Sequence, residues 1–578
     1  MRIRIAAATV AALLFPATEA LAGDPVMPLG EVHAGLQCTG YSVVRGTDVA
    51  AFDVEVIDVV DDRATGQGAR ILIKVSGPAV DETGLGPGFS GSPIYCPDAQ
   101  GTPRSIGAIS ESVGEYGGKV GLATPIEAIL GNPVDAPHAT AARSTLARAK
   151  PLAAPLTVTG LNTRLGNAVQ KAAAKRGRVV LAAPAGPLGS FPPQQLKPGS
   201  AFGVGYASGD IAASAIGTVT YTDGDRVWGF GHPLDGVGAR SLLLQDAYVF
   251  RVINNPLSIG DFSGTYKYAA AGHDVGTLTN DALSAVVGRV GALPATVPVN
   301  VFATDLDTGA KRSVSINVAD ESGVDDPTGG SILSFLAPLA VTQAAGTVLG
   351  GSPARLTGRA CFAITLKERR QPVRFCNRYV SDRADQSGAG NVVAGAASAD
   401  LLQALALIDG YKASELHVTG VEGSVQISRG QSQAYLRSVR LPRRGKAGHS
   451  VTATLTLRHV RGRLERRKVK LRLPENVRPG RHRRLVFTGT DVDSGEGDLS
   501  DLFGSFELDF QLGGSGGDLG PPNLRRLVAA IEGIGRYDGV SARPPSGDPE
   551  DFDPGEPSYR DPALRISGRA RATIRIRR

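Results

Sequence analysis

The stretch IGTVTYTDGDRVWGFGHP, residues 216–233, sets the expectation for the fold. β-Branched and aromatic residues run up to Asp223-Gly224 and resume after it, and an Asp-Gly pair between two such runs is a strong β-hairpin signal. The second run ends at His232, which stands between Gly231 and Pro233. The stretch therefore predicts a hairpin that delivers a histidine at a strand exit, a position unlike that of a core histidine.

Short β-like runs separated by turns continue on both sides of this hairpin. The N-terminal runs are Thr39–Val44, Phe52–Val60, Ile71–Val75, Ser105–Ile109 and Val120–Ala123, a spacing typical of a small barrel or sandwich. With 74 glycines, 37 prolines and 5% aromatic residues, the composition favours a turn-rich, mainly β chain. At 578 residues the chain has room for more than one core.

A glycine-rich turn, GPGFSGSPIY at residues 86–95, has the features that a serine nucleophile needs. Gly86, Gly88 and Gly91 leave the backbone free to take positive φ and let a substrate come close. Ser90 stands at the crown of the turn, where the backbone N–H groups of Gly88 and Ser90 could together bind a developing oxyanion. The alternative interpretation is an ordinary Gly/Pro/Ser loop.

Ser90 and His232 together indicate acyl-transfer chemistry. A serine hydroxyl is a poor nucleophile until a base takes its proton, and histidine has a suitable pKa near neutrality. Their separation along the chain is no objection, because the members of a catalytic triad occur in several chain orders.

The N-terminus predicts export. Arg2 and Arg4 precede an apolar run from Ile5 to Phe15, and Ala20-Leu21-Ala22 follows, which is the order of a secretory signal peptide with cleavage after Ala22. The run is too short to span a membrane. A second apolar stretch, residues 332–349, is interrupted by polar and helix-breaking residues and is interpreted as core or helix, so no transmembrane segment is expected. We expect a secreted or extracytoplasmic protein.

The four cysteines of an exported chain are more often paired than free, and four cysteines allow three connectivities. Cys361 and Cys376 flank two strand-like runs, so a hairpin would bring them together. Cys38 and Cys96 are then left for each other, and that pair would stiffen the turn that carries Ser90.

Several runs resemble the SpoIVB-type serine peptidases. They are GLQCTGY at residues 35–41, VAAFDVEV at 49–56, GFSGSPI at 88–94, IGA at 106–108, and the segment from Ile216-Gly217-Thr218 to Gly231-His232-Pro233. The likeness covers residues 28–300. It implies an exported serine endopeptidase of trypsin-like double β-barrel character, with Ser90 as nucleophile and His232 as general base. In the sporulation peptidase the histidine segment comes first, so the halves stand here in exchanged order.

The third catalytic residue is less defined. The family's acid lies in a short segment upstream of the serine, and the matching place here is Ser76-Gly77, where no carboxylate stands. Asp235 is the preferred substitute because it follows His232 by three residues, and Asp53 comes next. Asp81 and Asp281 are further candidates.

These inferences divide the chain into seven parts. They are a signal peptide (1–22), a serine-bearing barrel half (28–134), a linker with a helical insertion at Asn162–Arg176 (135–200), a histidine-bearing barrel half (201–320), a disulfide hairpin and a Gly/Ala-rich linker at 387–397 (321–398), an immunoglobulin-like β-sandwich opening on a helix at Asp400–Ile408 (399–515), and a helix at Asn523–Ile534 with a mobile basic tail (516–578).

The expected partner is a protein or peptide substrate. Lysines and arginines crowd between residues 437 and 484 and after 565, where they alternate with apolar residues as on the outward face of strands, and they could bind an anionic envelope surface. Nucleic acid is not expected, since aromatic stacking platforms are lacking. No metal-ligand spacing links the histidines, the acidic loop 491–498 lacks the glycine of a calcium loop, and no cofactor is expected. The alternative to an enzyme is a catalytically silent relative that binds peptides or the envelope.

Overall fold

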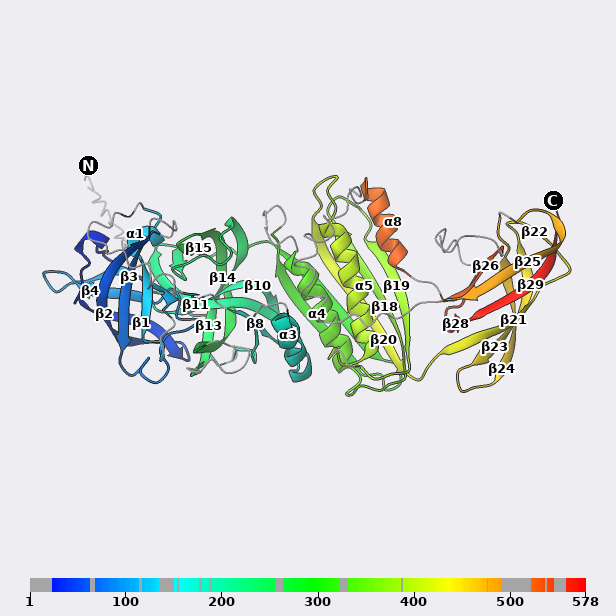
Figure 1. Ribbon diagram of the computed structural model, residues 1–578, viewed down its shortest axis with the longest axis horizontal. Helices are drawn as coiled ribbons and strands as arrows, with labels where there is room; N and C mark the ends of the chain where they lie inside the picture. The colour runs from blue at the N-terminus through cyan, green and yellow to red at the C-terminus, as the bar shows by residue number, and fades with distance from the viewer. Residues whose placement is uncertain are drawn as a thin grey trace, which may run out of the picture.

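The computed structural model describes residues 23–62, 68–113, 117–132, 134, 150–152, 155–175, 179–186, 190–254, 264–321, 331–385, 388–475, 477–490, 521–535, 538–544 and 558–577. It contains 52% strand and 14% helix, which confirms the prediction of a mainly β chain. The predicted signal peptide at 1–22, residues 136–149 of the predicted linker, the acidic loop 491–498 and residues 545–557 of the predicted tail lie outside the described residues. Figure 1 shows four units in a row from the N-terminus to the C-terminus.

The first unit is a closed barrel of six strands. Its order is β4-β1-β2-β3-β6-β5, and pairing of β4 with β5 closes it. Alternating burial, as in β3, places every second side chain in the barrel core. All five N-terminal strand predictions are confirmed. The elements are η1 (Leu29–Glu31), β1 (Gln37–Arg45), β2 (Asp48–Asp62), β3 (Gly68–Ser76), β4 (Pro93–Pro97), β5 (Pro103–Ser112), β6 (Val120–Pro125), α1 (Ile126–Ile129) and the short edge strand β7 (Lys150–Pro151).

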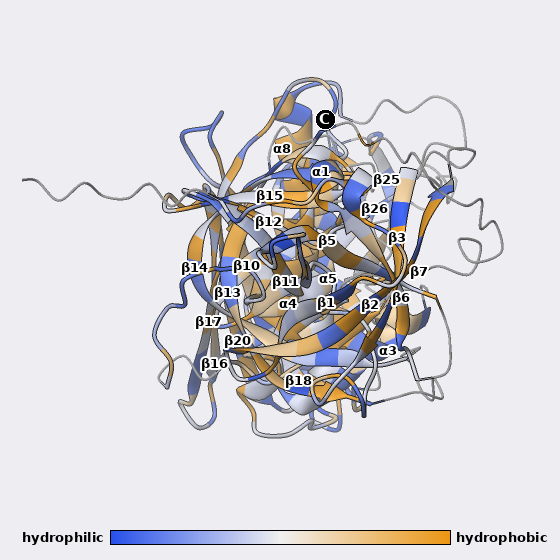
Figure 2. Ribbon diagram, turned by 90° about the vertical axis from the view of Figure 1, so that its left-hand side faces the viewer, coloured by the Kyte–Doolittle hydropathy of each residue, from blue (hydrophilic) through white to orange (hydrophobic). Residues whose placement is uncertain are grey.

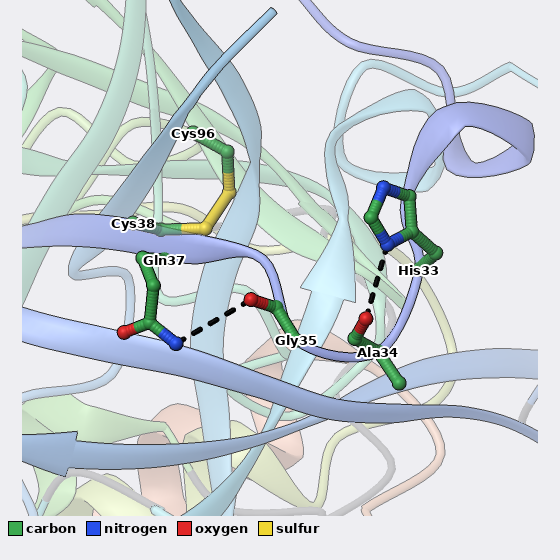
Figure 3. Close-up of a disulfide and its surroundings, with 6 residues drawn as sticks. All are labelled: His33, Ala34, Gly35, Gln37, Cys38 and Cys96. Carbon is green, nitrogen blue, oxygen red and sulfur yellow. Dashed lines mark hydrogen bonds between the residues drawn. A yellow bond between two sulfur atoms is a disulfide. The ribbon is translucent and has the colours of Figure 1, made fainter.

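A disulfide joins Cys38 of β1 to Cys96 of β4, as predicted (Figure 3). The two strands pair antiparallel beside it, with Thr39 opposite Tyr95. Because β4 begins directly after the serine turn, this crosslink fixes the C-terminal end of the turn to the barrel wall.

The second unit is another ring of six strands. Its order is β10-β13-β14-β15-β12-β11, and a pairing of β10 with β11 completes it. The predicted hairpin is confirmed, since Asp223 pairs with Arg226 and Gly224 has a φ of 58°. The strands are β10 (Ala201–Gly209), β11 (Ala212–Asp223), β12 (Arg226–Gly229), β13 (Gly238–Ile253), β14 (Tyr266–Ala282) and β15 (Ala285–Val290).

Two small apolar clusters join the two rings. Val43 of β1 packs among Ile216, Val249 and other residues of the second ring. On the other side, Ala108 and Ile126 pack with Trp228 and its neighbours. Viewed from the N-terminal end, Figure 2 shows apolar residues along the strands of this region and hydrophilic residues in the outer loops.

The third unit is a sheet covered by helices. It contradicts three predictions: the assignment of residues 296–319, the linker at 387–397 and the boundary at 399. Its sheet order is β19-β18-β20-β16-β17, continuous with the second ring through β10. Strands at 296–319, assigned to the histidine-bearing half, therefore lie in this sheet instead. The elements are α3 (Thr163–Lys175), β16 (Thr296–Asp305), β17 (Lys311–Ala319), α4 (Ile332–Thr347), β18 (Leu356–Leu366), β19 (Val373–Ser381), α5 (Val392–Asp409), β20 (Val418–Arg429) and α8 (Leu524–Ile534). Two short strands, β8 (Leu156–Thr159) and β9 (Val180–Ala182), instead extend the second ring from β11.

The predicted linker at 387–397 is wrong over most of its length, because α5 begins at Val392 rather than at residue 400. Its small residues allow close packing: a side chain on Gly346 of α4 would meet the carbonyl oxygen of Ala389 at 2.4 Å. The boundary at residue 399 is also wrong, since β20 pairs with β16 and β18 and not with the sandwich. The second disulfide prediction is confirmed by Cys361 and Cys376, which lie opposite each other on β18 and β19.

The apolar helices of this unit are buried in its core. α4 confirms the prediction of core or helix at 332–349. Within the described residues, α5 is the one helix whose length and apolar composition would allow it to cross a membrane, and 72% of that stretch is buried in the protein.

The fourth unit is a two-layer β-sandwich. A four-stranded sheet, β24-β23-β21-β28, and a five-stranded sheet, β22-β29-β25-β26-β27, share one apolar core. The predicted boundary at 515 is wrong, because β26–β29 come from the predicted tail and complete both sheets. The Arg-apolar alternation of residues 569–577 buries Ala570, Ile574 and Ile576, and it is a strand pattern despite its charge.

The sandwich strands are β21 (Gln433–Arg440), β22 (Arg444–Lys446), β23 (Ser450–His459), β24 (Leu464–Arg472), β25 (Gly480–Gly489), β26 (Gly539–Arg543), β27 (Tyr559–Arg560), β28 (Arg565–Ser567) and β29 (Arg569–Arg577). The helix α8, predicted from Asn523 to Ile534, lies within this part of the sequence but packs on the third unit through Leu527, Ile531 and Ile534. Asn523 caps its N-terminus.

Candidate functional site

The serine turn is built on two glycines with positive φ, Gly88 at 95° and Gly91 at 87°. A side chain on Gly91 would meet the carbonyl oxygen of Thr218 at 2.0 Å and the amide nitrogen of Phe230 at 2.5 Å. Glycine is therefore required at this position both for its backbone conformation and for the close approach of β11 and β12.

Strand β11 holds the carbonyl groups of the turn. The Thr218 N–H donates to the carbonyl of Ser90 at 2.8 Å, and its hydroxyl donates to the carbonyl of Gly88 at 2.9 Å. The Thr220 hydroxyl donates to the carbonyl of Gly91 at 2.8 Å. The turn is thus clamped between the two rings, and Ser90 is fully buried there.

The N–H groups of the turn fall into two sets. Those of Phe89, Gly91 and Ser92 donate to the carbonyls of Gly86, Ile109 and Phe89. The N–H groups of Gly88 and Ser90 donate to no acceptor among the described residues. These are the two groups that the sequence suggested for an oxyanion hole, and free N–H donors at a glycine turn suit that use.

His232 comes from the end of β12 and reaches the same place. Phe230 has a φ of 67° and Gly231 one of 68°, so the chain turns sharply before the histidine. The hydroxyl of Thr124 on β6 donates to the carbonyl of Gly231 at 2.7 Å. A side chain on Gly231 would lie 3.4 Å from the carbonyl oxygen of Ile109, the same group that accepts from the N–H of Gly91. The serine and histidine segments therefore meet on one stretch of β5.

His232 is 6% exposed, and its Nδ1 lies 2.6 Å from the carbonyl oxygen of Pro233. Because a carbonyl oxygen can only accept, Nδ1 carries the proton of the neutral ring and Nε2 holds the free lone pair. Burial lowers the pKa of His232 below its usual value, while the backbone groups of Pro233 and Leu152 oppose that shift. The ring is therefore neutral near pH 7, in the tautomer that a general base needs.

Ser90 Oγ and His232 Nε2 do not form a hydrogen bond with each other. Each is buried and without a hydrogen-bond partner, a state shared among the described residues only with the hydroxyls of Ser105 and Ser352. Buried polar atoms are nearly always paired, and a catalytic hydrogen bond often forms only when substrate is bound.

The structure does not bring the candidate acids to the imidazole. Asp235 accepts from Nη1 of Arg240 at 2.9 Å, and Asp53 lies on an exposed position of β2. Asp81 pairs with Lys119. Asp281 is buried and accepts from the N–H groups of residues 234–236, so it fixes the loop after His232. The Pro233 carbonyl occupies the place that was expected for a carboxylate.

Sequence reasoning missed two residues near the site. Glu111, on β5, is buried and paired with Arg70, and its charge raises the pKa of His232 against the larger effect of burial. Lys267 is 3% exposed and lies on β14 behind the serine turn. The signal for Lys267 was a single lysine at an inward position of the apolar strand Tyr266–Ala271.

No group of three or more metal-binding side chains lies together within the described ranges of the chain. Comparison of the chain with protein-family models, curated proteins and solved structures found no match. The interpretation of the site therefore depends on its geometry.

The depressed pKa of His232 predicts a specific pH dependence. The unfolded chain binds this proton at about pH 6.5 and the folded chain only at lower pH, so its contribution to stability is complete above pH 6.5 and is lost as pH falls towards the folded pKa. NMR titration of the imidazoles, assigned with His232→Gln, should show a resonance with a midpoint below the usual value. His449→Gln, at an exposed site, is the control. A His232 midpoint at or above 6.5 would contradict the buried neutral ring.

The clamp on the serine turn predicts the effect of Gly91→Ala. The new methyl group has to displace β11, and alanine has to adopt the positive φ of Gly91. We therefore expect a loss of about 2–4 kcal/mol in the free energy of unfolding, measured by denaturant titration. Gly101→Ala is the matched control, because Gly101 has a φ of 81° with nothing within 4 Å. It should cost only the backbone strain of about 1–2 kcal/mol. Equal losses would show that β11 does not press on the turn.

Proposed function

We propose that the chain is an exported serine endopeptidase of the SpoIVB type. The observation that carries the proposal is the meeting of Ser90 and His232 on one stretch of β5, each with a buried, unpartnered polar atom, beside two free backbone N–H groups. Two six-stranded rings that meet at the serine turn support a trypsin-like double barrel with its halves in exchanged order. Two sheets over one core support an immunoglobulin-like C-terminal sandwich.

The chemistry follows from the positions of these groups. Ser90 Oγ attacks the scissile carbonyl as its proton passes to Nε2 of His232, and a carbon–oxygen bond forms. The N–H groups of Gly88 and Ser90 bind the oxyanion. The peptide carbon–nitrogen bond then breaks, and His232 gives its proton to the leaving amine. Water, deprotonated by the same imidazole, releases the acyl group from Ser90.

Strand β5 is suited to hold an extended peptide beside these residues. The segment Lys150–Pro151 already pairs antiparallel with Glu111 and Ser112, and the N–H of Leu152 donates to the carbonyl of Ser110 at 2.9 Å. A substrate strand that takes the place of this segment can form the same backbone hydrogen bonds. The two disulfides suit an oxidising, extracytoplasmic compartment, which agrees with the predicted signal peptide.

Covalent labelling by a fluorophosphonate probe tests the proposed activity. We expect labelling of the wild-type chain, no labelling of Ser90→Ala, and a loss of about 10²- to 10⁴-fold in rate for His232→Ala, because the base is removed. Ser105→Ala is the matched control, since Ser105 Oγ is also buried and unpartnered but lies outside the turn. It should label like the wild type.

Absence of labelling in folded wild-type chain would overturn the enzyme and leave the alternative, a catalytically silent relative that binds peptides. Labelling that persists in Ser90→Ala would assign the nucleophile elsewhere.

The outer face of β24 supports a second part of the proposal, recruitment to an anionic cell-envelope polymer. Arg466, Lys468 and Lys470 are exposed on this face at every second residue, about 7 Å apart. They form no ion pair among the described residues. Threonines 452, 454 and 456 of β23 lie opposite them and add hydroxyl donors. A row of regularly spaced cations without counter-ions fits a polyanion.

Fluorescence anisotropy with long-chain polyphosphate tests this surface. The triple variant R466Q/K468Q/K470Q should bind about tenfold or more weakly than the wild type, and its affinity should depend less on salt. The matched control, K74Q/K311Q/R312Q, removes the same charge from exposed positions in other units. Equal losses in both variants would show that net charge, and not this face, governs binding.

A further inference from the structure

Lys267 makes contacts that none of the proposed catalytic steps uses. Its Nζ donates to Ser42 Oγ at 2.7 Å and to Thr218 Oγ1 at 3.1 Å, and it lies 4.5 Å from the centre of the Phe89 ring. Its backbone N–H donates to the carbonyl of Pro87 at 2.9 Å. The side chain therefore lies directly behind the serine turn, between the two rings.

Hydrogen bonds extend from this amine to both sides of Ser90. The hydroxyl of Thr218 accepts from Nζ and donates to the carbonyl of Gly88, which precedes Ser90 in the chain. Ser42 Oγ also accepts from the hydroxyl of Ser92 at 2.8 Å, after the serine. A side chain added to Gly88 would meet Cβ of Lys267 at 2.8 Å, so the stem of the lysine fills the space beneath the turn.

The environment of Lys267 contains no counter-ion among the described residues. The groups that face its side chain are the hydroxyls of Ser42 on β1 and Thr218 on β11 and the ring of Phe89 in the turn. Burial lowers the pKa of Lys267 to about 7.

We propose that Lys267, in its ammonium form, is a positioning residue that holds the serine turn in its anion-binding conformation. As an ammonium group it donates to Ser42 and Thr218 and presents its charge to the Phe89 ring. The carbonyl of Gly88 is thereby kept turned towards β11, which fixes the peptide between Gly88 and Phe89, and the free N–H groups of Gly88 and Ser90 lie on either side of that peptide. The proposal extends the proposed peptidase activity and depends on it only for the kinetic part of its test.

The kinetic test is the pH profile of fluorophosphonate labelling from about pH 5 to about pH 9. In the wild type we expect labelling to fall as pH rises through about 7, where Lys267 loses its proton. Lys267→Met should label about 10- to 100-fold more slowly, because the turn is no longer held in register, and without that alkaline decline. Lys267→Arg keeps the charge and should also lose the decline. Lys74→Met, at an exposed position of β3, is the matched control.

Amide hydrogen exchange supplies a readout that does not need activity. Lys267→Met should accelerate exchange at Phe89, Gly91 and Ser92, whose N–H groups are bonded in the wild type, and Lys74→Met should not. If the wild type does not label but Lys267→Met loosens the turn, the peptidase proposal fails and the positioning role stands. If Lys267→Met does not fold, Ser42→Ala removes the shorter of the two Nζ contacts and is measured in the same way.

Two results would overturn the positioning role. One is a Lys267→Met variant with the labelling rate, pH profile and amide exchange of the wild type. The other is labelling that rises with pH through 7 and maps by mass spectrometry to Ser42 or Ser92, because the neutral amine would then act as a base towards those hydroxyls.

Discussion

The close approach of β11 to the serine turn is the contact on which the candidate site depends. It requires a glycine at position 91, where any side chain would collide with the carbonyl oxygen of Thr218. With the strand in this position, Thr218 and Thr220 donate hydrogen bonds to the carbonyl groups of the turn. The consequence is an asymmetry, because the carbonyls of the turn are bonded while two of its N–H groups are left as donors. Such an asymmetry lets the backbone groups themselves create a local positive potential.

Strand β5 is the second element on which the site depends. The carbonyl of Ile109 accepts from Gly91 and lies close to Gly231, so the two segments are positioned against one common group although they are far apart in sequence. Because the rings also share the small clusters around Val43 and Trp228, a shift of one ring against the other would move Ser90 relative to His232. The separation of Oγ from Nε2 is therefore a property of the interface between the rings.

Much of the fold could be predicted from local patterns. The hairpin at Asp223-Gly224, the N-terminal strands, the helix at Asn523–Ile534 and the Cys361–Cys376 disulfide rest on local signals, and the structure confirms them. The Cys38–Cys96 disulfide, predicted by elimination, is confirmed as well. The domain boundaries could not be predicted, since they depend on which distant strands pair. β20 pairs in parallel with β16, and the C-terminal strand 569–577 pairs with β25. No local sequence pattern indicates either pairing. Small residues at 392–399 were ambiguous because they suit a linker and a tightly packed helix equally well.

The side chains of the candidate site could be predicted where a reactive residue type stood in a distinctive sequence context. A contact made by a backbone group could not be predicted. Ser90 and His232 stand out by their glycine neighbours. Lys267 was missed because a lone lysine in an apolar strand is uninformative until its neighbours are known. The partner of His232 was missed for a different reason, since every residue has a carbonyl and no sequence pattern points to that of Pro233.

A carbonyl in place of a carboxylate changes what the histidine can do. In serine peptidases, replacing the acid by its amide lowers turnover about 10⁴-fold because the imidazole takes the wrong tautomer. The Pro233 carbonyl selects the tautomer that the proposed general base requires. A neutral acceptor stabilises the imidazolium less than a carboxylate does, and burial disfavours the charged ring further. The negative charges of Glu111 and Asp281 act on the ring without touching it. In the proposed reaction, proton transfer to His232 would therefore depend on an oxyanion forming beside it, which would couple the proposed base to the two free N–H groups of the turn.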